Sequence, residues 1–269
     1  MTLRLLHLSD IHFGPPHLYS RLEGLSGLIE RADGVVISGD LTQRAKAVQF
    51  LAARKFLDSM AKPWIAVPGN HDIPLYPFHL RLFAPYLRWK RHFKGLTDSD
   101  LQLPNLCVTG ICTAHGLTLT EGRITNRQLL QLQRTLLRSS LSDVRILILH
   151  HPILPLPGDT RDRSIRGNRT LLRCLASNPI DLVLSGHVHR SLMQDVRDYL
   201  PRFPYSLPVS HIGTSTTNRG RGKEHGLQSC QMVEVDPRNI TLHHYLWSDS
   251  GFILTDTAIH SRRTRGRTS

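Results

Sequence analysis

Two kinds of targeting segment are missing from this sequence of 269 residues. No apolar run approaches the roughly 18 residues of a membrane-spanning helix. The N-terminus also lacks the charged start, long apolar centre and small-residue cleavage site of a secretory signal. We therefore expect a cytoplasmic protein without a transmembrane segment, with peripheral attachment to a membrane as the alternative.

Motifs for several common chemistries are also missing. The four cysteines stand singly, without C-x-x-C spacing, so we interpret them as reduced structural thiols. There is neither a G-x-x-x-x-G-K-[ST] run, whose backbone cradles nucleotide phosphates, nor a G-x-S-x-G turn, which carries a nucleophilic serine. If the protein handles phosphate groups, metal ions therefore have to do it.

Acidic residues are scarce, since 34 Lys and Arg stand against 21 Asp and Glu and give a formal net charge of +13. This charge favours anionic partners such as nucleotides, nucleic acid or an anionic membrane surface, although solubility alone explains it equally well. Residues 261–269 hold four arginines and no apolar side chain, which predicts a disordered basic tail. We expect residues 1–260 to form one domain, and the oligomeric state stays open.

Five polar motifs follow five short apolar runs in a fixed order. The runs are residues 3–8, 35–37, 64–67, 145–149 and 182–184, and each is typical of a buried strand. The motifs after them are Asp10-Ile11-His12, Gly39-Asp40, Gly69-Asn70-His71-Asp72, His150-His151 and Gly186-His187-Val188-His189. If these strands share one sheet, the motifs meet at its carboxyl edge, where open α/β folds bind ligands. Their oxygen and imidazole groups are the ligands that two neighbouring divalent metals require.

Segments of helical period separate these strands, at about residues 20–32, 44–60, 126–140 and 169–177. Thr125 or Asn126 is a suitable cap for the third of them. After the last motif the pattern changes to alternating segments at residues 209–213, 228–235 and 240–247. We expect Asp236-Pro237-Arg238-Asn239 to join the last two into a hairpin of a second sheet.

The motif order D-x-H, G-D, G-N-H-D, H and G-H-x-H resembles the signature of the calcineurin-like metallophosphoesterase superfamily, over residues 3–236. The resemblance implies an α/β fold, a four-layer αββα sandwich of two mainly mixed β-sheets flanked by helices. It implies two divalent metal ions, and the donor set without thiolate suits Mn, Fe or Zn. The implied ligands are Asp10, His12 and His189 for one ion, Asn70, His150 and His187 for the other, and Asp40 shared by both.

The expected chemistry follows from the charge of the substrate. Attack of water on a phosphodiester needs charge neutralisation and a stronger nucleophile, and a hydroxide that bridges two metals meets both needs. The resemblance makes His71 the general acid, and the neighbouring Asp72 is placed to orient it or raise its pKa. Adjacent side chains on an extended segment point apart, so only one ring of the pair at 150 and 151 should face the metals, and the resemblance favours His150.

The local sequence favours a phosphodiesterase. The D-I-H-F-G start and the S-G-D-L-T stretch resemble the class III cyclic-nucleotide phosphodiesterases, although Gln43 stands where that group often has Asp. Our leading hypothesis is hydrolysis of a small anionic phosphodiester such as a 3′,5′-cyclic nucleotide. The alternatives are pyrophosphate cleavage of a nucleotide-linked lipid, as in the UDP-diacylglucosamine hydrolases, a nuclease, and a non-catalytic metal- or phosphate-binding protein.

Two segments are candidates for the walls of the site. Residues 74–94 mix six aromatic with five basic side chains and begin directly after the third motif, so they are placed to form a lid with stacking surfaces and cations. An amphipathic helical pair with its aromatics packed inward explains the same pattern. Residues 157–169 form either a second wall or a plain surface loop.

Overall fold

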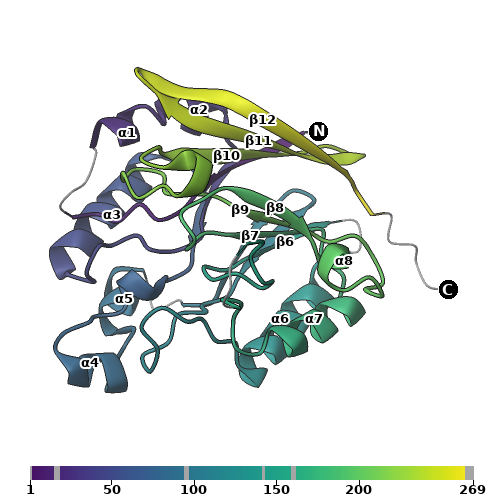
Figure 1. The fold of residues 1–269 in the computed structure, drawn as a ribbon, viewed down its shortest axis with the longest axis horizontal. Coiled ribbons are helices and arrows are strands. Elements are labelled where there is room, and N and C mark those ends of the chain that lie inside the picture. Colours follow the sequence, from purple (N-terminus) through teal and green to yellow (C-terminus); the bar gives the residue numbers. More distant parts are fainter. Residues whose placement is uncertain (1, 15–18, 94–96, 141–142, 159–161, 264–269) are drawn as a thin grey trace.

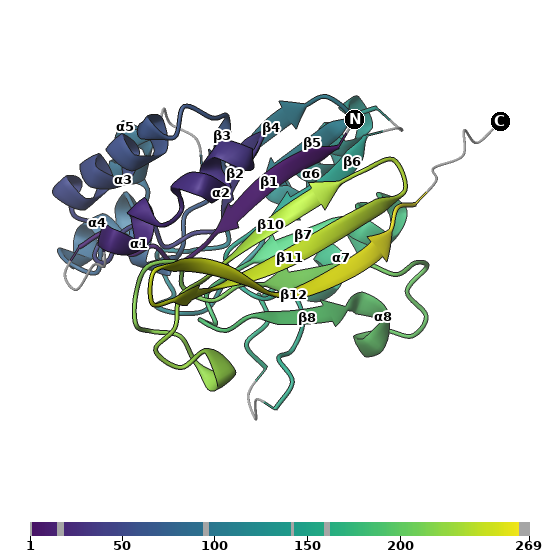
Figure 2. The same ribbon diagram turned by 90° about the horizontal axis from the view of Figure 1, so that it is seen from above.

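Two six-stranded sheets pack face to face in the computed structural model, which describes residues 2–14, 19–93, 97–140, 143–158 and 162–263 (Figures 1 and 2). The first sheet has the order β12-β11-β10-β1-β2-β3 and the second β4-β5-β6-β7-β9-β8. Strands of the first are β1 (Leu3–Leu8), β2 (Gly34–Ile37), β3 (Trp64–Ala66), β10 (Ser229–Val235), β11 (Asn239–Ser248) and β12 (Gly251–Ser261). Strands of the second are β4 (Ser99–Leu103), β5 (Leu106–Gly110), β6 (Val144–Ile148), β7 (Leu182–Ser185), β8 (Leu192–Asp195) and β9 (Pro208–His211).

Both sheets are mixed, which confirms the predicted fold class. β1, β2 and β3 run parallel, whereas β10, β11 and β12 join them by antiparallel pairing. In the second sheet β5, β6, β7 and β9 run parallel, and β4 and β8 close the edges antiparallel. The parallel strands β2, β6 and β7 are buried along their whole length, as expected when a sheet is covered on both sides.

Helices lie on the outer side of each sheet and complete four layers, although they leave part of β12 exposed (Figure 1). The helices are α1 (Tyr19–Glu23), α2 (Ser26–Arg31), α3 (Ala47–Ser59), α4 (Phe78–Phe83), α5 (Leu87–His92), α6 (Asn126–Arg138), α7 (Asn168–Ser177) and α8 (Val196–Tyr199). Leu5 of β1 packs with Ile146 of β6 between the sheets, while the next residue, Leu6, packs with Phe50 of α3 on the outer face. Alternate side chains of β1 therefore belong to two hydrophobic cores, one between the sheets and one between the first sheet and its helices.

The sheet membership of the motif-bearing strands differs from our expectation. β1, β2 and β3 lie in one sheet and β6 and β7 in the other, so the five strands do not share a sheet. The hairpin of β10 and β11 forms as predicted, with Asp236 N donating to Asn239 O at 3.0 Å. It is not part of a separate sheet, however, because β10 pairs with β1 and so covers an edge that would otherwise stay unpaired.

Local signals place most helices correctly. Thr125 caps α6, because its hydroxyl accepts a bond from Gln128 N at 3.3 Å while the Gln128 side chain accepts from Thr125 N at 3.0 Å. The segment at residues 20–32 is two short helices rather than one. The break falls at Gly24, where any side chain would overlap the Trp247 ring.

Residues 74–93 form the short helices α4 and α5, which divide their aromatics between core and surface. Trp89 and Phe93 are buried against α3, whereas Tyr76, Phe78 and Phe83 are exposed. Lys94 lies outside the described residues. Of the predicted tail, Ser261 ends β12, Arg262 and Arg263 are described, and residues 264–269 lie outside the described part. None of the helices in the described ranges is both long and apolar enough to span a membrane.

Candidate metal centre and its cavity

Hydrogen bonds from backbone N–H groups tie the five motifs to one another at one edge of the sandwich. His12 N donates to Asp40 O at 2.9 Å, and His71 N donates to Asp40 Oδ1 at 2.8 Å. Across the two sheets, His187 N donates to Asp10 Oδ2 at 3.0 Å. The carboxyl ends of the parallel strands thus meet although they belong to different sheets, because the two sheets are packed with these ends on the same side.

Four of the predicted ligands form a first buried group, made of Asp10, His12, Asp40 and His189. Their ligand atoms all lie within 4.8 Å of one another. His189 Nε2 lies 3.0 Å from Asp10 Oδ1 and 3.4 Å from His12 Nε2. Two imidazole nitrogens and two carboxylates therefore face one small volume.

The remaining predicted ligands form a second group beside the first. Asn70 Oδ1 lies 3.2 Å from His150 Nε2 and 3.1 Å from His187 Nδ1, and these two nitrogens are 3.3 Å apart. Asp40 Oδ2 lies 3.5 Å from His150 Nε2 and 3.8 Å from His12 Nε2. The carboxylate of Asp40 therefore stands between the two groups, and the structure brings together all seven predicted ligands.

Unpaired ring nitrogens show that these residues fit divalent cations. Nδ1 of His12 and Nδ1 of His189 are buried without a hydrogen-bond partner in the described part of the chain. A neutral imidazole carries one N–H. If the Nδ1 atoms of His12 and His189 hold the protons, the Nε2 lone pairs of both rings point at each other and at the carboxylates. Such convergence of lone pairs is unfavourable without a cation. The oxygen and nitrogen donors suit Mn, Fe or Zn.

The titration behaviour of four of the candidate ligands matches what metal ligands require. Burial lowers the pKa of His12 and of His187 to about 3, so both rings are neutral. Burial alone would raise the pKa of Asp10 and of Asp40, but the surrounding imidazoles outweigh it and lower both values. His150 is the exception, because burial would lower its pKa but Asp40 raises it to about 9, so a bound cation would have to displace its proton. Deprotonated carboxylates and neutral imidazoles are the forms that bind metal.

The backbone of the site is strained. Asp10, His12, Asp40, His187 and His189 have φ of 51°, 54°, 52°, 70° and 53°, and they are five of the eight non-glycine residues with positive φ in the described ranges. Such conformations persist where the surrounding structure over-determines them, and they cluster at functional sites. The motif glycines permit the close approach, because a side chain at Gly39 would overlap the His150 ring and one at Gly186 would overlap Ser9.

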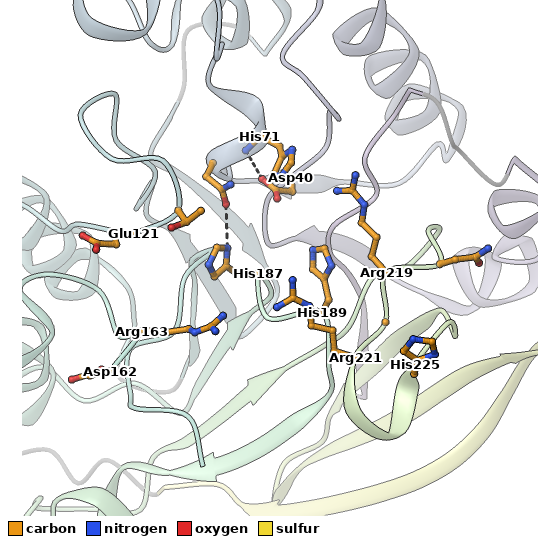
Figure 3. A pocket seen from close by; sticks show the side chains of 14 residues that line it. Asp40, His71, Glu121, Asp162, Arg163, His187, His189, Arg219, Arg221 and His225 are labelled. Carbon is orange, nitrogen blue, oxygen red and sulfur yellow. Dashed lines mark hydrogen bonds between the residues drawn. The ribbon is translucent and has the colours of Figure 1, made fainter. Parts of the chain in front are cut away.

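His71 lies beside both groups and faces the cavity (Figure 3). Its Nδ1 lies 2.8 Å from the carbonyl oxygen of Gln43, which only accepts, so Nδ1 carries a proton and donates it. The His71 and His12 rings meet edge to face, with centroids 4.8 Å apart. The hydrogen bond to Gln43 fixes the ring of His71 and leaves Nε2 as the second polar atom of that ring.

Asp72 is buried and its carboxylate binds the loop that carries Asp40. It accepts bonds from Leu41 N at 3.1 Å, Thr42 N at 2.8 Å and Gly69 N at 3.0 Å. Burial and the charge of Asp40 raise the pKa of Asp72 to about 7 despite these bonds. That Asp72 orients His71 or raises its pKa stays a prediction, and the observed contacts of Asp72 hold the second and third motifs together.

His151 lies closer to the site than we expected. The chain has left β6 at Ile148, so the rule for extended segments no longer applies, and the His150 and His151 rings are only 4.8 Å apart. Nδ1 of His151 lies 2.8 Å from Thr113 Oγ1, whereas its Nε2 is buried without a partner among the described residues. A ligand atom of His151 lies within 4.8 Å of those of His150 and His187. His150, which contacts Asp40 and Asn70, stays the predicted ligand.

A cavity of about 860 Å³ opens in front of the ligands (Figure 3). Asp40, Asn70, His71, His187 and His189 line its floor. Its walls are Thr120, Glu121, Asp162, Arg163, Asn218, Arg219, Gly220, Arg221 and His225.

The walls agree only in part with the two predicted segments. Asp162 and Arg163 come from residues 157–169, of which 159–161 lie outside the described part. None of the described residues 74–93 lines this cavity. The five motifs did not indicate Arg219 and Arg221, although the Arg-Gly-Arg-Gly-Lys run at residues 219–223 is a local concentration of positive charge that could have indicated them.

Comparisons with known proteins agree with this geometry. A family model described as calcineurin-like phosphoesterase matches residues 3–191. The chain is 27% identical over 233 residues to glycerophosphodiester phosphodiesterase GpdQ of Enterobacter lignolyticus (strain SCF1), which covers 78% of this chain and 81% of that protein. It is 27% identical over 207 residues to 3′,5′-cyclic adenosine monophosphate phosphodiesterase CpdA of Escherichia coli (strain K12), which covers 72% of each.

Solved structures share the fold at low sequence identity. Purple acid phosphatase PPD1 from yellow lupin superposes with a TM-score of 0.78 at 12% identity, over 97% of this chain and 54% of that one. A dimetal phosphatase from Danio rerio superposes with a TM-score of 0.63 at 12% identity, over 96% of this chain and 98% of that one.

Proposed function

This chain belongs to the calcineurin-like phosphoesterase family, and from that premise we propose that it hydrolyses small anionic phosphodiesters with the help of two divalent metal ions. The observation that carries the proposal is the position of Asp40. Its Oδ2 lies 3.8 Å from His12 Nε2 in the first ligand group and 3.5 Å from His150 Nε2 in the second. One short carboxylate between two sets of donors suits a pair of cations that share a ligand.

The protein is a metallophosphoesterase, a hydrolase that acts on phosphoesters. Preference for diesters is our proposal, supported by the names of its relatives, which are phosphodiesterases for glycerophosphodiesters and for cyclic AMP. A 3′,5′-cyclic nucleotide stays our representative substrate. A substrate panel should include glycerophosphodiesters, nucleotide-linked lipids and single-stranded DNA, since preference for either of the last two would favour the lipid pyrophosphate or nuclease alternative.

Each motif residue has a proposed task. Asp10, His12 and His189 would hold one ion, Asn70, His150 and His187 the other, and Asp40 both. Bound divalent ions would neutralise the phosphate oxygens and lower the pKa of a water so that it can attack phosphorus.

His71 is our proposed general acid. The Gln43 carbonyl accepts from Nδ1 of His71 and fixes the ring, and a protonated ring would pass its Nε2 proton to the departing alcohol oxygen. We assign Asp72 a positioning task, because its carboxylate binds the backbone on both sides of the Asp40 side chain.

The proposal is tested by removing the shared carboxylate. Metal-depleted protein is reloaded with Mn²⁺, its metal content is measured by mass spectrometry, and hydrolysis of bis(p-nitrophenyl) phosphate is compared with that of p-nitrophenyl phosphate. We expect Asp40→Asn to bind less metal and to lose about a hundredfold or more in turnover, since metal assistance contributes several kcal/mol. Asp249→Asn, at an exposed turn, is the matched control and should behave as wild type. Protein that holds two metals and hydrolyses no phosphoester would instead be a binding protein.

A further inference from the structure

One wall of the cavity is a basic loop that the proposed chemistry does not use. Residues 218–226, between β9 and β10, read Asn-Arg-Gly-Arg-Gly-Lys-Glu-His-Gly, and we call them the arginine loop. Arg219, Arg221 and His225 of this loop line the cavity together with the candidate ligands Asp40, His187 and His189. Figure 3 shows Arg219 on the side of Asp40, and Arg221 beside His189.

The base of the arginine loop is bonded to the candidate ligands. Thr214 Oγ1 donates to Asp10 O at 2.8 Å, and Ser215 N donates to Ser9 O at 3.0 Å. Arg221 N donates to His189 O at 2.7 Å. The positions of the arginines are therefore set relative to the metal centre.

Buried side chains brace the arginine loop from inside. Nε2 of Gln228, which is 2% exposed, donates to Asn218 Oδ1 at 2.8 Å and to the carbonyl oxygen of Gly226 at 3.1 Å, and so closes the loop at its two ends. The one acid of the loop, Glu224, is directed to the other side, where its carboxylate accepts from Ser191 N and contacts His244 Nε2, both at 3.0 Å. The loop thus turns its carboxylate away from the cavity and its arginines toward it.

Arg219 and Arg221 lie two positions apart on the same loop, so their positive charges repel each other. The acids that line the cavity are engaged elsewhere, because Asp40 is a candidate ligand, Glu121 pairs with Arg166, and Asp162 Oδ1 accepts from Ser164 N at 2.8 Å. On the opposite wall, Figure 3 shows Arg163 directed toward the same space in front of His187. An anion other than the metal-bound phosphate would relieve this repulsion.

We propose that Arg219 and Arg221 form a second anion subsite, which binds a phosphate group of the substrate other than the one that is cleaved. Guanidinium groups recognise phosphate through paired charge-assisted hydrogen bonds. The cavity of about 860 Å³ lies within the range of sites for molecules larger than a simple diester. The inference rests on the proposed function and extends it. Phosphodiesters that carry a second phosphate group would bind more tightly than those that carry only the phosphate that is cleaved, such as a 3′,5′-cyclic nucleotide.

A pair of substrates that differ by one phosphate tests the subsite. Thymidine 5′-(4-nitrophenyl phosphate) and its 3′-phosphorylated derivative release the same chromophore. We expect wild type to show a KM about tenfold lower for the derivative, as one charge-assisted hydrogen bond provides. Arg219→Gln and Arg221→Gln should each remove most of this preference and leave kcat, and KM for the first substrate, within about twofold of wild type. Arg238→Gln, in the turn between β10 and β11, is the matched control.

Two kinetic results would overturn the inference. One is an equal KM of wild type for both substrates. The other is an equal rise in KM for both substrates in Arg219→Gln, which would mean that the arginine binds the phosphate that is cleaved.

A binding measurement separates this inference from the proposed function. Calorimetry compares the affinity of the protein for thymidine 3′,5′-bisphosphate with its affinity for thymidine 5′-phosphate. This measurement does not depend on turnover. Wild type should bind the bisphosphate more tightly than the monophosphate, and Arg219→Gln and Arg221→Gln should lose this difference. That result supports the subsite even if wild type hydrolyses neither diester. In that case only the proposed function fails. Equal binding of the two nucleotides by wild type rules the subsite out. Equal melting temperatures of variants and wild type establish that the folds are the same.

Discussion

Replacing Trp89 by Ala asks whether α5 belongs to the core or serves as a mobile lid. Trp89 is only 1% exposed, and its ring centroid lies 4.5 Å from that of Phe93 and 6.2 Å from that of Phe50 in α3. Truncating such a side chain costs the transfer free energy of the ring plus the cavity left behind, about 3–5 kcal/mol. Because whole domains are stable by only about 5–15 kcal/mol, Trp89→Ala should unfold at a much lower urea concentration than wild type.

The assay is urea unfolding followed by circular dichroism, with kcat/KM measured on the metal-loaded protein well below the unfolding midpoint. Phe83→Ala is the control, since Phe83 on α4 is 85% exposed and its loss should change the free energy of unfolding by less than about 0.5 kcal/mol. We expect kcat/KM of Trp89→Ala to stay near that of wild type, because α5 does not line the cavity. Unchanged stability together with a large loss of kcat/KM would refute the core assignment and make the segment a lid.

Three further predictions concern the site and the loop beside it. His71→Ala should lower turnover by about a hundredfold to ten-thousandfold, most for poor leaving groups, with metal content unchanged; loss of both metals would make His71 a ligand instead. Asp72→Asn should lower the free energy of unfolding by about 1–3 kcal/mol, because the amide nitrogen cannot accept the backbone N–H bonds that one of the carboxylate oxygens accepts, and an unchanged urea midpoint would contradict the bracing task. Burial raises the pKa of Glu224, but bonds from His244 and Ser191 outweigh it and leave the value below its ordinary 4.5. The ionised Glu224 therefore stabilises the fold above pH 4.5, and this contribution is lost as the pH falls through the folded-state pKa. The melting temperature of Glu224→Gln should accordingly depend less on pH below 4.5 than that of wild type, whereas an equal dependence would exclude the contribution.

Features with local causes could be predicted from the sequence. Short apolar runs followed by glycine and polar residues predicted β1, β2, β3, β6 and β7. The predicted first and last residues of these strands differ from the observed ones by about one residue or less. The Thr125 cap and the turn before Asn239 were also predicted, since each depends on residues only three or four positions apart.

Strands without such signals were missed. β12 exposes Ile253, Leu254 and Ile259, and so it lacks the polar and apolar alternation of a half-buried strand. β4 and β8 lie at sheet edges, each paired with one neighbour, and their residues are at most partly buried. Pairing with an adjacent strand, and not the local pattern, makes these segments extended.

The sequence by itself determined which residues carry the proposed chemistry. Each motif consists of neighbouring residues, and the glycines that let the motifs approach one another are part of them. Only the tertiary structure decided how they meet. The Asp40 carboxylate stands between two ligand groups because strands of two different sheets end on the same side of the sandwich. The arginine loop reaches the cavity because Thr214 and Ser215 bind the chain at Asp10 and Ser9, about 200 positions earlier. Contacts over such separations depend on the packing of whole layers, which no local pattern encodes.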